Sequence, residues 1–139
     1  AVPLEEIGRT VAKDFKRIQD LKPMIANADI SMPKEFLNYI IKELLDNAFK
    51  YSPKNTLVRM TGINEGDTYR VIVQDGGIGF PKESLEDFEP YVRSNKDQVK
   101  GLGLSLYNIK NLIELFKGEI TVSSEEGVGS SFTLSLPKA

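Results

Sequence analysis

The sequence predicts an α+β fold, in which a mixed, mostly antiparallel sheet is covered on one face by three helices. Two β-branched runs, residues 57–63 and 68–74, flank turn-forming residues at 64–67, and this arrangement is a hairpin signature. The predicted helices and strands do not alternate in a βαβ order, which argues against a Rossmann fold. The 139 residues are therefore expected to form one domain, a two-layer α/β sandwich spanning residues 1–139.

The chain begins with a predicted amphipathic helix over residues 4–20. Its apolar side chains recur at intervals of three and four, which is the period of a helix: Leu4, Ile7, Val11, Phe15 and Ile18. Pro23 is expected to end this helix, because proline lacks a backbone donor and clashes with the preceding turn. A weak, short strand is predicted over residues 24–30.

A second, long helix is predicted to begin after Ser31, which supplies a cap, with Pro33 in its first turn. It runs to about Tyr51, and Pro53 stops it. One stripe of this helix is apolar and is predicted to face the core: Leu37, Ile40, Ile41, Leu44, Leu45 and Ala48. A polar stripe beside it carries Glu43, Asn47, Lys50 and Tyr51, of which Glu43 and Asn47 are predicted to lie between core and solvent. Glu35, Lys42 and Asp46 are predicted to point away from both stripes, on a third side of the helix. Taken alone, this polar stripe also fits an ordinary solvated helix face.

The second half of the chain contains a polar stretch and a third helix. Residues 89–100 lack hydrophobic periodicity and are predicted to be mobile. An apolar stripe over residues 102–116 predicts the helix, which Gly118 ends. Two closing strands are predicted at residues 119–124 and 130–136, and the glycine-containing segment between them reads as a hairpin turn.

Composition excludes several classes of function. A net charge of −2 and a pI near 5.3 provide no general basic surface, so no nucleic-acid partner is expected. Without cysteine or histidine, any metal is expected to be a hard cation bound by oxygen atoms. Apolar stretches fall short of the ~18 residues of a membrane span. We therefore expect a cytoplasmic location, no direct membrane contact from this domain, and a chain excised from a longer protein.

Two glycine-containing segments are candidate ligand-binding loops. Asp75-Gly76-Gly77-Ile78-Gly79 follows a predicted strand, and GLGL at residues 101–104 opens the third helix. Glycine lets the backbone approach a ligand closely, and a helix N-terminus offers free N–H groups to a phosphate. Each segment alone is equally compatible with a turn or with close packing.

Taken in order, five segments resemble the motifs of one ATPase superfamily. They are ELLDNAFKYSP, DGGIGF, FEPYVR, GLGLSLYNIKNLIELFKGEI and GVGSSFTLSLP. Over residues 4–137, their order and spacing resemble the ATP-binding domain of sensor histidine kinases, within the gyrase, chaperone, histidine kinase and mismatch-repair ATPase superfamily. The resemblance implies a Bergerat-type ATP-binding fold, with ATP and Mg²⁺ as ligands.

The resemblance also implies roles for the long helix. Asn47 would coordinate Mg²⁺ through its side-chain oxygen, a ligand type that suits a hard cation. Glu43 would polarise a metal-bound water or help to shape the γ-phosphate site. Lys50 would offset phosphate charge, and Tyr51 would lie against the adenine. Glu43, Asn47 and Lys50 are thus the catalytic candidates.

The remaining implied site residues lie in the two glycine-containing segments and between them. Asp75 would accept a hydrogen bond from the adenine amino group and so select ATP over GTP. Gly77 and Gly79 would let the loop pass under the nucleotide. The nucleotide-contacting residues at the end of a mobile lid would be Gly101, Leu102, Gly103 and Leu104. Three lid cations are candidates for phosphate contact, and the sequence does not choose among them: Arg93, Lys96 and Lys100.

The sequence departs from the family pattern at three positions, of which Lys117, where a histidine is frequent, is expected to matter little. Val99 stands where a glycine commonly opens GxGxG, so the lid is expected to pivot mainly about Gly101 and Gly103. Gly76 stands where an asparagine often follows the aspartate, so one metal or phosphate contact is expected to be missing.

A histidine kinase domain of this kind moves the γ-phosphoryl group of ATP to a histidine on a separate dimerisation domain, with a response regulator downstream in a two-component system. This chain has no histidine, so the acceptor is expected outside it. Two alternatives remain. One is a degenerate nucleotide-binding or docking module without catalysis, and the other is a protein-serine kinase or another ATPase of the same superfamily.

Overall fold

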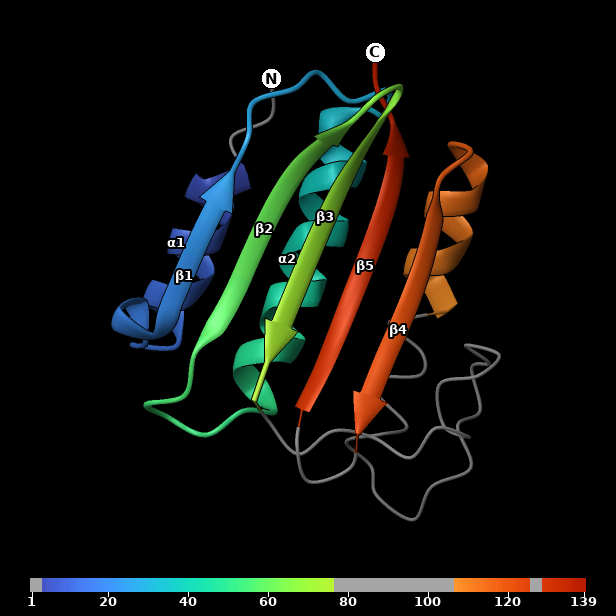
Figure 1. The fold of residues 1–139 in the computed structure, drawn as a ribbon. Helices are drawn as coiled ribbons and strands as arrows, with labels where there is room; N and C mark the ends of the chain where they lie inside the picture. Colours follow the sequence, from blue (N-terminus) through green and yellow to red (C-terminus); the bar gives the residue numbers. More distant parts are fainter. Residues whose placement is uncertain (1–3, 77–106, 126–128) are drawn as a thin grey trace.

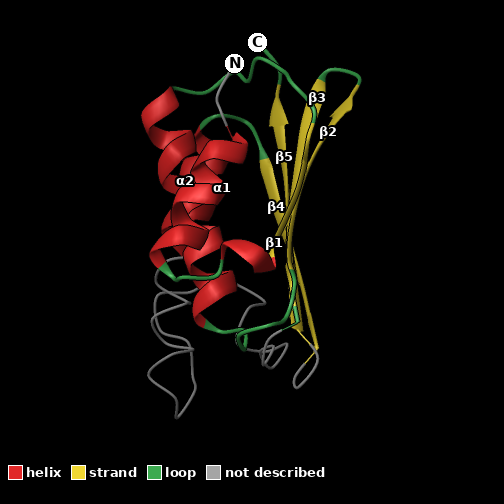
Figure 2. Cartoon of the chain, turned by 90° about the vertical axis from the view of Figure 1, so that its left-hand side faces the viewer, coloured by secondary structure: helices red, strands yellow, loops and turns green. Residues whose placement is uncertain are grey.

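The computed structural model describes residues 4–76, 107–125 and 129–139. Within these ranges, helices lie on one face of a five-stranded sheet, so the molecule has two layers (Figures 1 and 2). The elements are α1 (Leu4–Asp14), the 3₁₀ turn η1 (Ile18–Asp20), β1 (Leu21–Ile25), α2 (Lys34–Lys50), β2 (Val58–Glu65), β3 (Thr68–Asp75), a helical segment at residues 107–115, β4 (Glu119–Glu125) and β5 (Gly129–Pro137). The predicted α/β sandwich is confirmed.

The strand order is β1-β2-β3-β5-β4, and only the β1–β2 pair among these described strands is parallel. The sheet is therefore mixed and mostly antiparallel, as predicted. Glu65 pairs with Thr68, which leaves Gly66 and Asp67 as the two residues of the predicted hairpin turn. At the opposite end of the sheet, Asp75 pairs with Ser130, so the end of β3 lies beside the start of β5.

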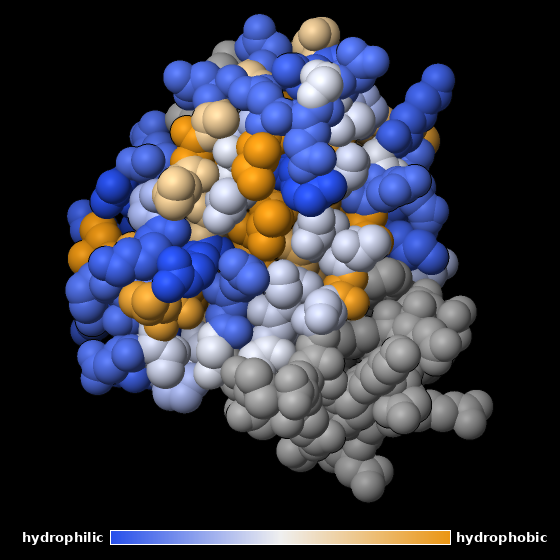
Figure 3. Space-filling model, viewed as in Figure 1, coloured by the Kyte–Doolittle hydropathy of each residue, from blue (hydrophilic) through white to orange (hydrophobic). Residues whose placement is uncertain are grey.

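The core lies between the sheet and the helices. The predicted apolar stripe of α2 is completely buried: Leu37, Ile40, Ile41, Leu44, Leu45 and Ala48. Every second residue of β3 faces these helices, because Tyr69, Val71 and Val73 are buried while their neighbours are more exposed. The opposite face of the sheet presents polar and apolar side chains to solvent (Figure 3).

The first predicted helix and strand have the wrong boundaries. Helix α1 ends at Asp14 instead of residue 20, because Lys16 adopts a left-handed conformation with φ of 57°. Pro23 does not end a helix but lies inside β1. An edge strand tolerates proline, because one side of it makes no ladder hydrogen bonds. The strand predicted at residues 24–30 therefore starts earlier and ends at Ile25, and Ile30 makes an isolated bridge to Lys138.

Two predicted helix ends also differ. Pro33, not Ser31, is the N-cap of α2, and no side chain caps this helix. The backbone N–H of Ser31 instead donates to the carbonyl of Pro137, at 2.8 Å. At the end of the helical segment at residues 107–115, the left-handed residue is Lys117, with φ of 65°, and the N–H of Gly118 donates to the carbonyl of Ile113 at 2.8 Å.

The buried guanidinium of Arg17 holds the end of α2. Its Nη1 donates to the carbonyl of Phe49 at 2.8 Å, and its Nε donates to Oδ2 of Asp20 at 2.7 Å. The hydrogen bond from Arg17 holds the pKa of Asp20 below its ordinary value, against the opposing effect of burial. A lowered folded-state pKa means that this carboxylate stabilises the fold above about pH 4, and that the contribution is lost as the pH falls further.

Gly129 is a position where a side chain should be costly. Its φ is 149°, and a Cβ there would collide with the carbonyl oxygen of Asp75. The left-handed conformation alone costs an alanine about 1 to 2 kcal/mol. We expect Gly129→Ala to lower the free energy of unfolding, measured by urea denaturation, by clearly more than this amount. Gly66→Ala is the matched control, since Gly66 has φ of 61° but open space around it. Equal losses in the two variants would show that the close approach to Asp75 is not tight.

Candidate functional site

The last two turns of α2 present the predicted polar stripe. Glu43 and Asn47 are half-buried, so their predicted position between core and solvent is confirmed, whereas Lys50 is exposed and Tyr51 is buried. Tyr51 is the C-cap, and its N–H donates to the carbonyl of Asn47 at 3.0 Å. The Nζ atom of Lys50 lies 5.4 Å from the centroid of the Tyr51 ring, within cation–π range. Helix geometry alone therefore places an acid, an amide, a cation and an aromatic ring at one end of α2.

The side-chain amide of Asn47 is the notable polar group of this stripe. Among the described residues, its Nδ2 atom is buried and has no hydrogen-bond partner. An unpaired buried donor costs about 1–3 kcal/mol, so nearly all such atoms in folded proteins have a partner, which can be a bound ligand. A phosphate oxygen would accept from this nitrogen, and the carbonyl oxygen of the same amide is a ligand suited to Mg²⁺. The residue therefore fits the predicted metal and phosphate.

Asp46 lies three residues after Glu43 on α2 and is half-buried, although the sequence predicted that it points away. Burial raises the pKa of Asp46, and the nearby carboxylate of Glu43 raises it further, while Lys42 opposes them. A raised folded-state pKa means that the protonated form of Asp46 is favoured in the folded protein. Its contribution to stability is therefore largest at low pH and decreases as the pH rises through the folded-state pKa.

Asp75 ends β3 on the side of the sheet that faces the helices, because it follows the alternation of Val71 and Val73. Its Oδ2 atom accepts a hydrogen bond from Oγ of Ser130 at 2.8 Å. Ser130 is buried and, as the second residue of β5, pairs directly with Asp75. Ser130 was not among the predicted site residues, since only the pairing of β3 with β5 reveals it. The hydroxyl fixes one carboxylate oxygen of Asp75.

These two groups of residues lie at the same end of the sandwich. The C-terminal end of α2, the end of β3 and the start of β5 come together there (Figures 1 and 2). Helix α2 also packs against β3. The fold thus brings Asp75, at the end of β3, to the same end of the molecule as the four residues at the C-terminal end of α2: Glu43, Asn47, Lys50 and Tyr51.

The comparisons with known proteins agree with this arrangement. Residues 33–139 match the family model described as histidine kinase-, DNA gyrase B-, and HSP90-like ATPase. The chain belongs to this ATPase family. The predicted family is confirmed, and this domain is an ATPase domain of the kind found in sensor histidine kinases.

Sensor kinases are among its curated relatives. The chain is 36% identical over 110 residues to the autoinducer 2 sensor kinase/phosphatase LuxQ of Vibrio vulnificus, covering 73% of this chain and 13% of that protein. It is 33% identical over 138 residues to the sensor-like histidine kinase SenX3 of Mycobacterium tuberculosis, covering 96% of this chain and 34% of that protein. The chain therefore spans about a third or less of the length of these relatives.

Solved histidine kinase structures share the fold. The catalytic domain of histidine kinase ThkA superposes with a TM-score of 0.76 at 27% identity, covering 97% of this chain and 92% of that one. The mycobacterial sensor histidine kinase MprB superposes with a TM-score of 0.73 at 23% identity, covering 96% and 93%, and this likeness concerns the fold alone.

Several predicted site residues of this ATPase domain fall outside the described residues. These are Gly77, Gly79, Arg93, Lys96, Lys100, Gly101, Leu102, Gly103 and Leu104. Their roles, and the predicted mobility of the lid, stay predictions. In the described part of the chain, no helix has the length and apolar character needed to cross a membrane.

A groove of about 420 Å³ lies elsewhere on the ATPase domain, between α1 and α2. It is lined by Glu6, Ile7, Thr10, Val11, Asp14, Lys34, Asn38 and Lys42. No predicted site residue lines it. The groove faces a side of α2 different from that of Asn47, so we do not assign the nucleotide to it.

Proposed function

We propose that this domain binds ATP together with Mg²⁺ and donates the γ-phosphoryl group to a histidine that lies outside the chain. One observation carries the proposal beyond family membership: the buried Nδ2 atom of Asn47 has no partner among the described residues, and it lies on the last turns of α2, at the end of the sandwich where β3 ends at Asp75. A purine nucleoside triphosphate needs a donor for its phosphates and an oriented acceptor for its adenine, and Asn47 and Asp75 would supply these two groups.

Each residue would have a separate role. The carboxylate of Asp75, held by Ser130, would accept the adenine amino hydrogen. Tyr51, with Lys50 against its ring, would border the base and the phosphates. The carbonyl oxygen of Asn47 would hold Mg²⁺, its Nδ2 would donate to a phosphate oxygen, and Glu43 would orient a water on the metal. When bound, Mg²⁺ neutralises charge on the transferring phosphoryl group.

The acceptor and the partners follow from the chemistry of the transfer. The 139 residues contain no histidine, so the acceptor would be carried by a dimerisation domain on the same parent chain or on a partner. A response regulator would receive the phosphoryl group next. We place this domain in the cytoplasm, whether or not its parent protein is membrane-anchored. Because in-line transfer requires a positioned nucleophile, the isolated domain should bind ATP with little turnover.

The test combines binding with transfer. We expect calorimetry to show ATP binding that is much weaker in EDTA than in Mg²⁺, because the cation offsets the phosphate charge. With the histidine-bearing segment of the parent protein added, radiolabel from the γ-phosphate should appear on that segment in an acid-labile form. Binding that does not depend on Mg²⁺, with no transfer, would support the degenerate module instead. An acid-stable product would support a serine kinase.

A further inference from the structure

Arg17 is the most completely hydrogen-bonded buried charge among the described residues. The residue is 2% exposed and belongs to none of the predicted motifs. A guanidinium has five N–H donors. They are directed at Oδ2 of Asp20 (2.7 Å) and at four backbone carbonyls, those of Phe49 (2.8 Å), Ser52 (2.9 Å), Pro53 (2.8 Å) and Thr56 (3.2 Å). Every donor therefore has an acceptor.

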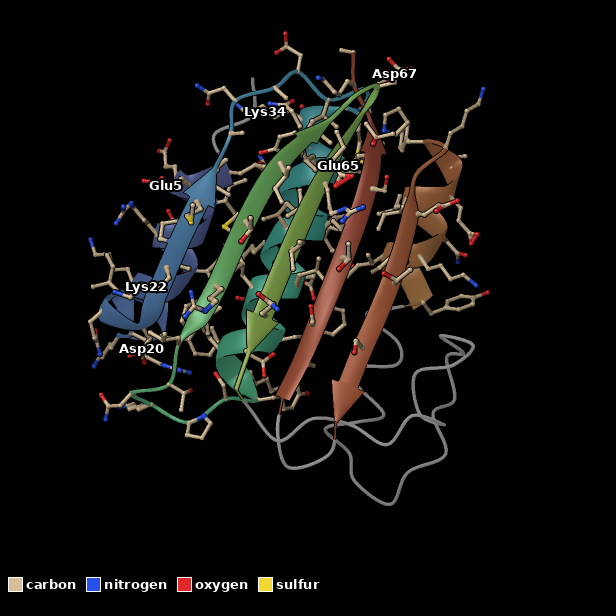
Figure 4. The ribbon with its side chains drawn as sticks, in the orientation of Figure 1. Glu5, Asp20, Lys22, Lys34, Glu65 and Asp67 are labelled. Atoms are coloured by element: carbon tan, nitrogen blue, oxygen red, sulfur yellow. The ribbon has the colours of Figure 1, made fainter. Side chains whose placement is uncertain are left out.

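Four of these acceptors lie on one short segment, the end of α2 and the loop that follows it. A cation at a helix C-terminus also interacts favourably with the helix dipole. Asp20 adds a further contact to this loop, because the same Oδ2 atom accepts a hydrogen bond from the backbone N–H of Asn55 at 3.0 Å. Figure 4 shows Asp20 at the end of the molecule where the loop from α2 to β2 passes. Arg17 and Asp20 together thus fix the backbone of residues 49–56.

This loop borders the adenine side of the candidate site. It begins at Tyr51, which the proposed function places against the base. It ends near Asp75, since a Cβ built on Gly76 would lie 4.0 Å from the Cβ of Thr56. A displacement of the loop would change the distance between the ring of Tyr51 and the carboxylate of Asp75. The hydrogen bonds of Arg17 go to Asp20 and to the loop backbone, so its influence on these two side chains would pass through that backbone.

We propose that Arg17 is a positioning residue for adenine recognition, which sets the place of the loop after α2 relative to the end of β3. The inference rests on the proposed function, because it assigns the base to the space between Tyr51 and Asp75. The planar fork of Arg17 reaches four carbonyls at once. Lysine keeps the charge but offers three donors from a single point, so it cannot hold the same loop geometry.

The test is Arg17→Lys in the 139-residue chain, with nucleotide binding measured by calorimetry well below the unfolding temperature. We expect Kd to rise about tenfold, and by the same factor for ATP and ADP, because both carry the adenine. Arg9→Lys is the matched control: Arg9 lies on α1 and makes an exposed pair with Glu5, so Kd should stay unchanged.

The outcomes separate positioning from simple stabilisation. A lower unfolding temperature with an unchanged Kd would overturn the inference and leave Arg17 as a stabilising residue only. A loss confined to ATP would also overturn it, because that result would place the effect on the γ-phosphate. Should Arg17→Lys fail to fold, Asp20→Asn provides the test, since it keeps every carbonyl contact of Arg17 and should weaken ATP and ADP equally but less. Failure of the wild-type chain to bind ATP would instead remove the proposed function.

Discussion

Asn47→Ala should abolish Mg²⁺-dependent ATP binding and lower phosphoryl transfer by about a hundredfold or more, while the domain stays folded. The substitution removes the carbonyl oxygen that would hold the cation and the Nδ2 donor. Because that donor is buried and has no partner among the described residues, its removal should not destabilise the domain and should raise the unfolding temperature slightly. Calorimetry with and without Mg²⁺ and a thermal scan of the same sample measure both effects.

Asn38→Ala is the control for this prediction. Asn38 lies on the same helix and is also half-buried, but it lines the groove between α1 and α2. We expect it to leave ATP binding unchanged. If Asn47→Ala instead lost its cooperative unfolding transition, the amide would serve the fold, and the polar stripe of α2 would be an ordinary helix face.

The part of the site on α2 could be predicted because the relative positions of side chains on a helix depend only on their spacing in the sequence. A rotation of about 100° per residue decides which side chains share a face, whatever the rest of the chain does. The stripe from Leu37 to Ala48 is therefore buried as predicted, and Glu43 and Asn47 lie at its border. The hairpin of β2 and β3 could be predicted for the same reason, because its turn lies within the turn-forming residues 64–67 and both strands adjoin that turn.

The interactions that depend on distant pairing could not be predicted in the same way. Ser130 contacts Asp75 only because β5 pairs with β3 in one register, and the residues are 55 positions apart. Arg17 reads as one more cation in an amphipathic segment, and nothing local indicates that it caps a helix that ends more than thirty residues later. The prediction that Pro23 ends a helix was wrong for a related reason. A strand accepts proline at its edge, and only the sheet order shows that β1 is an edge strand.

Asp75→Asn should remove most of the preference for ATP over GTP. The wild-type carboxylate can only accept hydrogen bonds, so it pairs with the adenine amino group and repels the guanine carbonyl. Asparagine has the same size but offers an NH₂ group that can donate to that carbonyl. We expect ATP binding to weaken about 10- to 100-fold, which is the loss of one hydrogen bond to a charged group, while GTP binding improves. Calorimetric titration of both nucleotides against both proteins gives the four constants.

Ser130→Ala separates the orientation of Asp75 from its chemistry. This variant keeps the carboxylate but removes the hydroxyl that donates to Oδ2, so ATP should bind several-fold more weakly while remaining preferred over GTP. Ser131→Ala is the matched control, because Ser131 is the next residue on β5 and points to the opposite face of the sheet. Since a carboxylate that reads adenine must exclude guanine, unchanged ATP and GTP affinities in Asp75→Asn would place base recognition on another residue.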